Sequence, residues 1–273
     1  MKQHIDDPRP PSVLSIAGSD SGGGAGIQAD LKTFAAFGVH GLTAIAALTA
    51  QNTCGVTAVH VPPTSFLREQ IDVLFADFRI GAVKLGMLAN ADVIVTVADA
   101  LEAHAGPRIV LDPVMVSTSG ARLLDADALE ALSQRLFPLS TLLTPNLHEA
   151  ELLLGRPIHD TDAMEAAARD LHARSGAAVL MKGGHLPGTE VTDLLFDGSN
   201  TLRMQHPRLN IEGHGTGCTL SAAIAAKLAQ GWELEAACRD AADYVHGALR
   251  HASHPGKGDI AVLGHGWREN RSA

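Results

Sequence analysis

The sequence predicts an α/β protein, a three-layer α/β/α sandwich around a mostly parallel, doubly wound sheet. Short apolar runs alternate with segments of helical periodicity along most of its 273 residues, and parallel strands require crossover connections of this kind. Near the end, two apolar runs flank Asp197-Gly198-Ser199-Asn200, a turn signal typical of an antiparallel hairpin. That late hairpin argues against a closed barrel of eight regular strand–helix units.

Each element is predicted from a change of periodicity and from the residues that close it. The strands are apolar runs ended by glycine, proline or polar residues, and the helices repeat apolar residues every three or four positions. The predicted strands are 13–17, 42–48, 56–61, 82–85, 108–111, 141–143, 178–181, 191–196 and 201–205. The predicted helices are 27–37, a segment capped by Thr64 and reaching Phe78, 91–104, 126–136, 147–154, 161–175, one after Gly217 and 234–251.

The net charge, the length of the apolar runs and the cysteine content argue against several classes of protein. A formal net charge of −9, from 21 basic and 30 acidic residues, argues against a nucleic-acid or anionic-membrane partner. No apolar run is long enough to span a membrane. The three cysteines, Cys54, Cys218 and Cys238, form no CxxC pair, which predicts reduced thiols in a cytoplasmic protein. We expect one domain over residues 1–273, with flexible tails at 1–11 and 255–273.

A glycine-rich stretch, 214–219, lies where irregular chain turns into a helix-forming segment. At such a boundary, unpaired backbone N–H groups and the positive end of the helix dipole converge, which suits a phosphate or a developing anion. Its two glycines, Gly215 and Gly217, would let that anion approach the backbone closely. A purely structural turn explains the glycines equally well, so both interpretations stay open on this stretch alone.

Further polar residues follow predicted strands, at the edge where open α/β sheets bind ligands. Asn146 and Glu149 stand at a helix start and suit Mg²⁺, although an N-cap with its capping-box partner is the simpler interpretation. Asp112 is a second candidate metal ligand or a turn residue, and Lys182 is a candidate phosphate ligand or an exposed loop lysine. Together with the glycine stretch they suit phosphoryl transfer, which depends on positioning and electrostatic stabilisation.

Seven motifs carry a specific resemblance to a known family. They are SIAGSDSGGGAGIQADLK (15–32), AQNT (50–53), KLGM (84–87), LDPVM (111–115), LTPN (143–146), MKGGH (181–185) and HGTGCTL (214–220). In sequence and in order they are similar to the hydroxymethylpyrimidine/phosphomethylpyrimidine kinases of thiamine biosynthesis. That family belongs to the ribokinase-like superfamily, whose three-layer fold agrees with the predicted one.

The resemblance implies a reaction and its cofactors. The family uses ATP and Mg²⁺ to phosphorylate 4-amino-5-hydroxymethyl-2-methylpyrimidine, and then phosphorylates the monophosphate to the diphosphate. We expect Lys182, Asn146 and Thr216 to bind this ATP, and Glu149 and Asp112 to bind the metal. A homodimer is expected by analogy with relatives of this fold, and a monovalent cation is a further candidate cofactor.

The resemblance also assigns the pyrimidine pocket. Gln51 would hydrogen-bond the aminopyrimidine, a task that suits an amide because it donates and accepts at once. Backbone groups near Ala25 and Val114, the Met87 side chain and Asp30 would complete the pocket. The alternatives are ordinary core positions for Met87 and Val114 and a solvated helix position for Asp30.

Cys218 stands where the sugar kinases of this superfamily carry an aspartate that acts as base on the substrate hydroxyl. We expect Cys218 to accept or relay that proton, while the backbone amides of Gly215, Thr216, Gly217 and Cys218 stabilise the transferring phosphoryl group. A helix N-terminus should lower the pKa of the thiol and bound phosphates should raise it, and the sequence leaves that balance open.

Two other functions are alternatives. A pyridoxal kinase of the same fold would share much of this pocket, because pyridoxal is also a flat heteroaromatic with a hydroxymethyl group. A non-catalytic pyrimidine or nucleotide sensor is disfavoured, because the glycine stretch, Lys182 and the Asn146–Glu149 pair are all intact.

Overall fold

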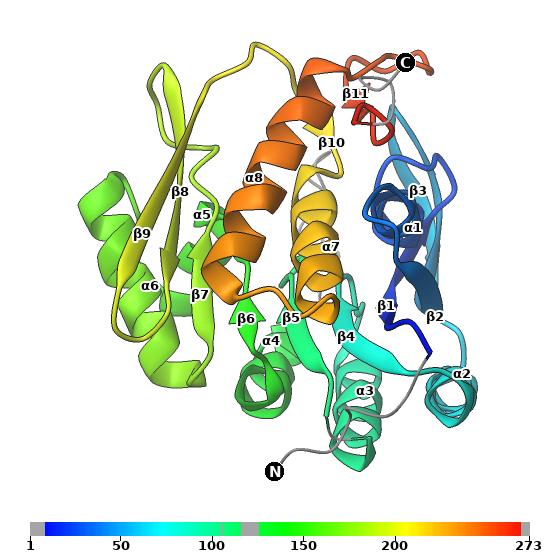
Figure 1. The fold of residues 1–273 in the computed structure, drawn as a ribbon. Coiled ribbons are helices and arrows are strands. Elements are labelled where there is room, and N and C mark those ends of the chain that lie inside the picture. Colours follow the sequence, from blue (N-terminus) through cyan, green and yellow to red (C-terminus); the bar gives the residue numbers. More distant parts are fainter. Residues whose placement is uncertain (1–8, 105, 116–125, 269–273) are drawn as a thin grey trace.

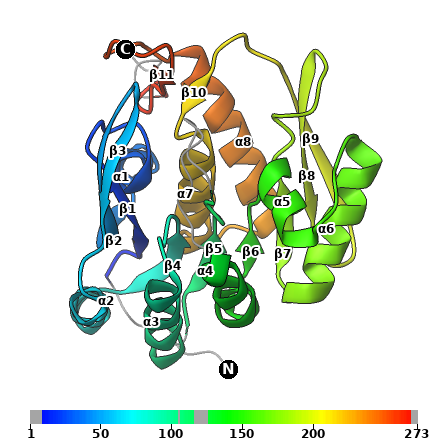
Figure 2. The same cartoon turned by 180° about the vertical axis from the view of Figure 1, so that it is seen from behind.

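The computed structural model describes residues 9–104, 106–115 and 126–268. Within them it confirms the three-layer α/β/α sandwich, with helices on both faces of one central sheet (Figures 1 and 2). The nine strands of that sheet lie in the order β3-β2-β1-β4-β5-β6-β7-β8-β9. The strands from β2 to β7 in this order are parallel. At one edge β3 is antiparallel to β2, and at the other β8 is antiparallel to both of its neighbours, β7 and β9.

Most elements lie close to their predicted positions. The strands of the central sheet are β1 Ser12–Asp20, β2 His40–Asn52, β3 Gly55–His60, β4 Ile80–Leu85, β5 Arg108–Leu111, β6 Leu142–Leu143, β7 Ala178–Met181, β8 Glu190–Phe196 and β9 Thr201–Pro207. The helices are α1 Gly26–Ala36, α2 Thr64–Asp77, α3 Ala91–Ala103, α4 Ala126–Ala131, α5 Leu147–Leu154, α6 Thr161–Ser175, α7 Thr216–Ala229 and α8 Leu234–Arg250. A second, two-stranded sheet pairs β10 (Gly213–His214) with β11 (Ala261–Val262).

Apolar clusters cover both faces of the central sheet, which explains why its inner strands are continuous apolar runs. Successive residues of a strand point to opposite faces. In β1, Leu14 therefore joins the cluster that includes α2, α3 and α6, whereas Val13 joins the cluster that includes α1, α7 and α8. None of the helices in the described part of the chain is both long and apolar enough to cross a membrane.

Several predictions about element ends are wrong, among them that of strand β2, which runs from His40 to Asn52 rather than over 42–48. Pro63 is the N-cap of α2 without any side-chain cap bond, and Thr64 is already the first helical residue. The predicted helix 126–136 is α-helical only to Ala131, and Leu132–Leu136 continues as a π-helix. Strand β1 runs beyond its predicted end because its backbone keeps pairing with β2 as far as Asp20.

The predicted flexible tail at 255–273 is wrong for residues 255–268, which pack against the rest of the molecule. Strand β11 pairs in parallel with β10, which directly precedes α7. The buried His265 contacts Thr219 of α7, with 3.1 Å between Nε2 and Oγ1. In the predicted N-terminal tail, the carbonyl of Arg9 accepts a hydrogen bond from Arg79. The remaining tail residues, 1–8 and 269–273, lie outside the described residues.

Candidate active site

A cavity of about 740 Å³ runs along the carboxyl ends of the parallel strands. Residues of β9 and α8 also line it. It brings together almost all of the predicted site residues. Its lining includes Ala25, Gln51, Met87, Asp112, Val114, Asn146, Glu149, Lys182, Gly215, Thr216, Gly217 and Cys218. Asp30 does not line this cavity and lies behind it.

The start of α7 forms the floor of the cavity. Its N-cap, Gly215, has a left-handed backbone (φ 80°, ψ 16°), and no side chain caps the first turn. The N–H groups of that turn therefore have no side-chain cap as a partner, and the turn itself lines the cavity. A Cβ on Gly217 would lie 3.0 Å from Nζ of Lys182 and 3.4 Å from Oδ2 of Asp112, so this ion pair lies directly over the helix start.

Three ionisable side chains surround that point. Nζ of Lys182 lies 2.7 Å from Oδ1 of Asp112 and 3.8 Å from Oε2 of Glu149. Asp112 and Glu149 are only 1% and 5% exposed. Burial disfavours the charge of Lys182, but attraction to the two carboxylates outweighs it and raises the pKa of the ammonium. Burial raises the pKa of Glu149 to about 7, against the opposing effect of Lys182.

Glu149 has a structural role as well, because the capping box predicted as the simpler interpretation is present. Its backbone N–H donates to Oδ1 of Asn146 (2.9 Å), and its Oε2 accepts from the backbone N–H of Asn146 (2.8 Å). The Glu149 carboxylate also accepts a hydrogen bond from the backbone N–H of Met115, and the nearby charge of Asp112 helps to raise its pKa. Carboxylate oxygens such as those of Asp112 and Glu149 are the hard donors that Mg²⁺ prefers, directly or through water. Among the described residues no group of three or more His, Cys, Asp or Glu side chains could hold a metal, so a magnesium ion here would keep water or nucleotide oxygens.

Replacing Glu149 with glutamine is expected to change how stability depends on pH. The pKa of Glu149 rises from 4.5 to about 7 in the folded protein, so the folded state favours the protonated carboxyl. Its contribution to stability is fully present below about pH 4.5 and is lost as the pH rises through about 7. Urea unfolding should therefore show wild-type stability falling relative to Glu149→Gln across this window. A pH-independent difference between the two proteins would contradict the raised pKa.

The thiol of Cys218 is partly exposed at the cavity and lies in the first turn of α7. Burial raises its pKa, and the charges of Asp30 and Asp112 act in the same direction. Lys84 and the backbone N–H of Gly26 oppose this effect without reversing it. The sequence left the balance open, and in the structure these effects together hold the pKa of the thiol above its usual value.

A buried ion pair lies behind Cys218 and was missed by the sequence analysis. Nζ of Lys84 contacts both carboxylate oxygens of Asp30 at 3.0 Å, and Oγ of Ser15 donates to Oδ2 of Asp30 at 2.5 Å. Both charged side chains are 0% exposed, so the alternative of a solvated helix position for Asp30 is wrong. The available signal was a lysine inside the apolar run of β4, because buried lysines are rare unless paired.

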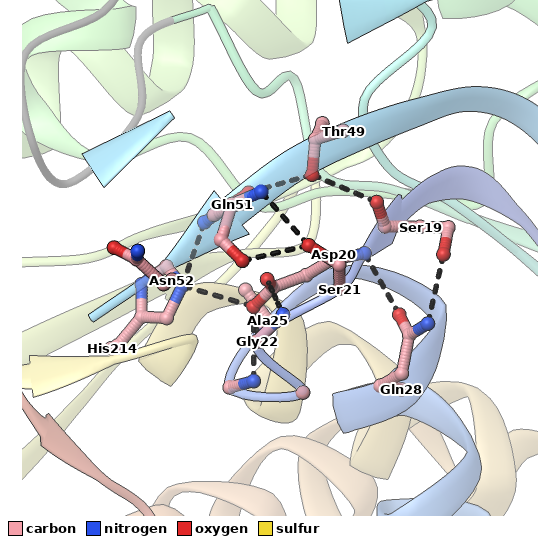
Figure 3. Close-up of polar contacts among 12 residues, drawn as sticks. Ser19, Asp20, Ser21, Gly22, Ala25, Gln28, Thr49, Gln51, Asn52 and His214 are labelled. Atoms are coloured by element: carbon pink, nitrogen blue, oxygen red, sulfur yellow. Dashed lines mark hydrogen bonds and ion pairs between the residues drawn. The ribbon is translucent and has the colours of Figure 1, made fainter. Parts of the chain in front are cut away.

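One end of the cavity is built around Gln51 (Figure 3). A bulge in the pairing of β2 with β3 lies between Ala50 and Gln51, and bulges turn side chains toward sites at strand ends. Figure 3 shows Gln51, Asp20 and His214 pointing toward one another from β2, the end of β1 and β10. Neither Asp20 nor His214 was predicted as a site residue, although an aspartate two residues before a run of three glycines is a turn signal.

The other end of the cavity lies between the loop after β7, β9 and α8. Its lining includes His185, His206, Arg208, Val245, His246 and Leu249, none of which was predicted. The rings of His206 and His246 stack with 5.0 Å between centroids. Arg208 donates to the carbonyls of Gly184 (2.7 Å) and Gly188 (2.8 Å), which braces the loop that follows Lys182.

Comparisons with known proteins agree with this geometry. Residues 20–263 match the family model described as phosphomethylpyrimidine kinase. The hydroxymethylpyrimidine/phosphomethylpyrimidine kinase of Rhizobium meliloti (strain 1021) is 49% identical over 263 residues, covering 94% of this chain and 98% of that protein. A solved phosphomethylpyrimidine kinase from Clostridium difficile 630 is 41% identical, with a TM-score of 0.78 over 86% of this chain and 98% of the other. An ADP complex of Bacillus subtilis pyridoxal kinase is 32% identical, with a TM-score of 0.88 over 96% and 100%.

Proposed function

The chain belongs to the phosphomethylpyrimidine kinase family of phosphotransferases, and from this membership we propose a two-step reaction. With ATP as donor, the protein phosphorylates 4-amino-5-hydroxymethyl-2-methylpyrimidine and then the monophosphate, in thiamine diphosphate biosynthesis. The observation that carries the proposal is the position of Lys182. It lies between Asp112 and Glu149, over the start of α7, in the cavity that also contains Gln51.

Each part of this arrangement has a task in the proposed transfer. The N–H groups at the start of α7 bind the transferring phosphoryl group, aided by the helix dipole. Lys182 and Asn146 bind phosphate oxygens of ATP, and Thr216 adds a contact at the same helix start. Asp112 and Glu149 hold Mg²⁺ directly or through water, and the bound metal neutralises charge on the phosphates.

At the acceptor end, Gln51 binds the aminopyrimidine edge, with Met87, Val114 and the backbone near Ala25 along the ring. Asp30 acts from behind the cavity through Lys84 rather than by touching the ring. Cys218 accepts or relays the proton of the substrate hydroxyl. A thiol with a raised pKa is compatible with that role, because a loose, dissociative transition state requires little base strength.

Replacing Cys218 tests this role. Cys218→Ala is expected to lower kcat for both phosphorylations by about 10²-fold or more, and Cys218→Ser to retain part of the activity, because a hydroxyl can still relay a proton. The matched control is Cys54→Ala, which changes an exposed thiol and should leave turnover unaffected. Near-wild-type turnover by both Cys218 variants would exclude the proton-transfer role.

A second candidate substrate is pyridoxal, because the pyridoxal kinase of Bacillus subtilis shares this fold over its full length. The deciding experiment compares turnover of the pyrimidine alcohol, its monophosphate and pyridoxal by the same preparation. The proposal predicts turnover of both pyrimidines and a clear preference over pyridoxal. Turnover of pyridoxal but of neither pyrimidine would contradict the proposed function and identify a pyridoxal kinase.

Three accompanying features stay predictions. We propose a cytoplasmic homodimer that acts on small molecules without a nucleic-acid partner, in line with the acidic net charge of −9 and the reduced cysteines. A monovalent cation that increases turnover is expected by analogy with other members of the superfamily. Sedimentation tests the homodimer, and assays in potassium-free buffer test the monovalent cation.

A further inference from the structure

His214 lies between Gln51, at the substrate end of the cavity, and the start of α7. It is the last residue of β10 and directly precedes Gly215, the N-cap of α7. Its side chain is 12% exposed and lines the same cavity as Gln51. Nε2 of His214 lies 2.9 Å from Nε2 of Gln51 and 3.2 Å from Oδ2 of Asp20, so one ring nitrogen serves two partners (Figure 3).

The position of this imidazole is fixed from several sides. Strand β10 pairs with β11, which places His214 opposite Val262. The ring packs on the glycine loop, where a Cβ on Gly24 would lie 2.6 Å from its Cδ2. Asp20 is fixed in turn, because its carboxylate accepts from the backbone N–H groups of Gly22 (2.8 Å), Gly24 (2.9 Å) and Ala25 (2.8 Å).

A neighbour on the other side of Gln51 does not determine which way its amide faces. Oγ1 of Thr49 lies 3.0 Å from Oε1 of Gln51 and 2.9 Å from the carbonyl oxygen of Ser19. A hydroxyl both donates and accepts. Thr49 can therefore donate to the amide oxygen, or donate to Ser19 and accept from the amide nitrogen. Either orientation of Gln51 satisfies it.

Asp20 removes this freedom at His214. An ionised carboxylate only accepts hydrogen bonds, so the Nε2 that lies 3.2 Å from Oδ2 of Asp20 carries a hydrogen and donates it there. Such a nitrogen cannot accept from the amide nitrogen of Gln51, so a half-turn of the amide brings its oxygen toward the imidazole. Gln51 then has one orientation, whereas without the imidazole both orientations are equally good.

We propose that His214 is the positioning residue that fixes the order of donor and acceptor that Gln51 presents to the substrate ring. This inference rests on the proposed function, in which Gln51 hydrogen-bonds the edge of an aminopyrimidine. The edge of that ring has a bare nitrogen beside an amino group, so it pairs with an amide in one orientation only. The 4-oxo counterpart has a ring N–H beside a carbonyl, so its donor and acceptor stand in the reverse order. A fixed amide discriminates between these two alcohols, and a freely turning one does not.

The test measures the ratio of kcat/KM for the 4-amino alcohol to that for its 4-oxo counterpart. The wild type is expected to discriminate by about 10²-fold or more, because the wrong edge leaves buried polar groups unpaired. His214→Phe, which keeps a flat ring without nitrogen, should reduce the ratio by about tenfold or more, mainly through KM for the alcohols, with KM for ATP little changed. His214→Asn, whose side chain is shorter, is a second variant with the same expectation.

Thr49→Val is the matched control. It removes the other side-chain contact of Gln51 and should weaken binding of both alcohols alike, leaving their ratio unchanged. An unchanged ratio in folded His214→Phe or His214→Asn would overturn the inference while leaving the proposed function intact. If the wild type turns over neither pyrimidine, the proposed function fails and the inference fails with it.

Discussion

Replacing Lys84 with methionine is expected to lower the free energy of unfolding by about 3–5 kcal/mol, because it leaves the carboxylate of Asp30 buried without a counter-charge. Both side chains are 0% exposed, and Nζ of Lys84 contacts the two oxygens of Asp30 at 3.0 Å. Methionine has a similar length and occupies the same space, so the change removes the charge more than the packing. Urea unfolding monitored by circular dichroism measures the loss.

Two further variants show whether the lost stability comes from the unpaired charge or from packing. In Lys84→Met/Asp30→Asn both charges are gone, and Ser15 keeps a hydrogen-bond acceptor, so most of the stability should return. Arg239→Met breaks an exposed pair with Glu235, whose side chains are 51% and 62% exposed, and should cost less than about 1 kcal/mol. Equal losses in the single and double variants at Lys84 would show that packing, not charge, was removed.

Replacing Gly215 with alanine is expected to lower kcat by about 10²-fold or more, because the new Cβ would lie 2.1 Å from the carbonyl oxygen of Gly24. Either the start of α7 or the loop that contains Gly24 must then move, and both segments border the cavity. The N–H groups at the start of α7 would no longer face the transferring phosphoryl group. Steady-state kinetics with the pyrimidine alcohol and ATP measure the effect.

Gly231 provides the matched control at the other end of α7. It also has a left-handed backbone, with φ 85° against 80° for Gly215, but no atom lies within 4 Å of a Cβ built on it. Gly231→Ala should therefore cost about 1–2 kcal/mol of stability and leave kcat unchanged. If both alanine variants lose the same stability and Gly215→Ala keeps its turnover, the start of α7 does not bind the phosphoryl group.

The elements that sequence reasoning located best are those with local stop and start signals. Helix α6 occupies its predicted residues because Asp160 caps its start, with Oδ1 accepting from the N–H of Ala163, and Gly176 ends it in a left-handed conformation. Strand β5 likewise is a lone apolar run before Asp112. Where tertiary pairing decides, as at the polar end of β1 and at β11, no local signal exists.

The same division holds within the site. The residues near the ends of β5 and β7 were identified because each follows an apolar run at the edge where parallel strands end. The pairing of Lys84 with Asp30 joins residues 54 positions apart, and the contact of His214 with Asp20 joins residues 194 positions apart. A single sequence contains no signal for such pairs beyond the unusual burial of the charge itself.

The pairing of β10 with β11 makes the order of assembly matter for the site. Strand β10 leads directly into α7, while its partner β11 follows α8, whose Tyr244 carbonyl accepts a hydrogen bond from the indole of Trp267. All strands of the central sheet precede α7 in the chain, so they can pair before β11 is in place. The start of α7 is supported only once this later segment has paired with β10.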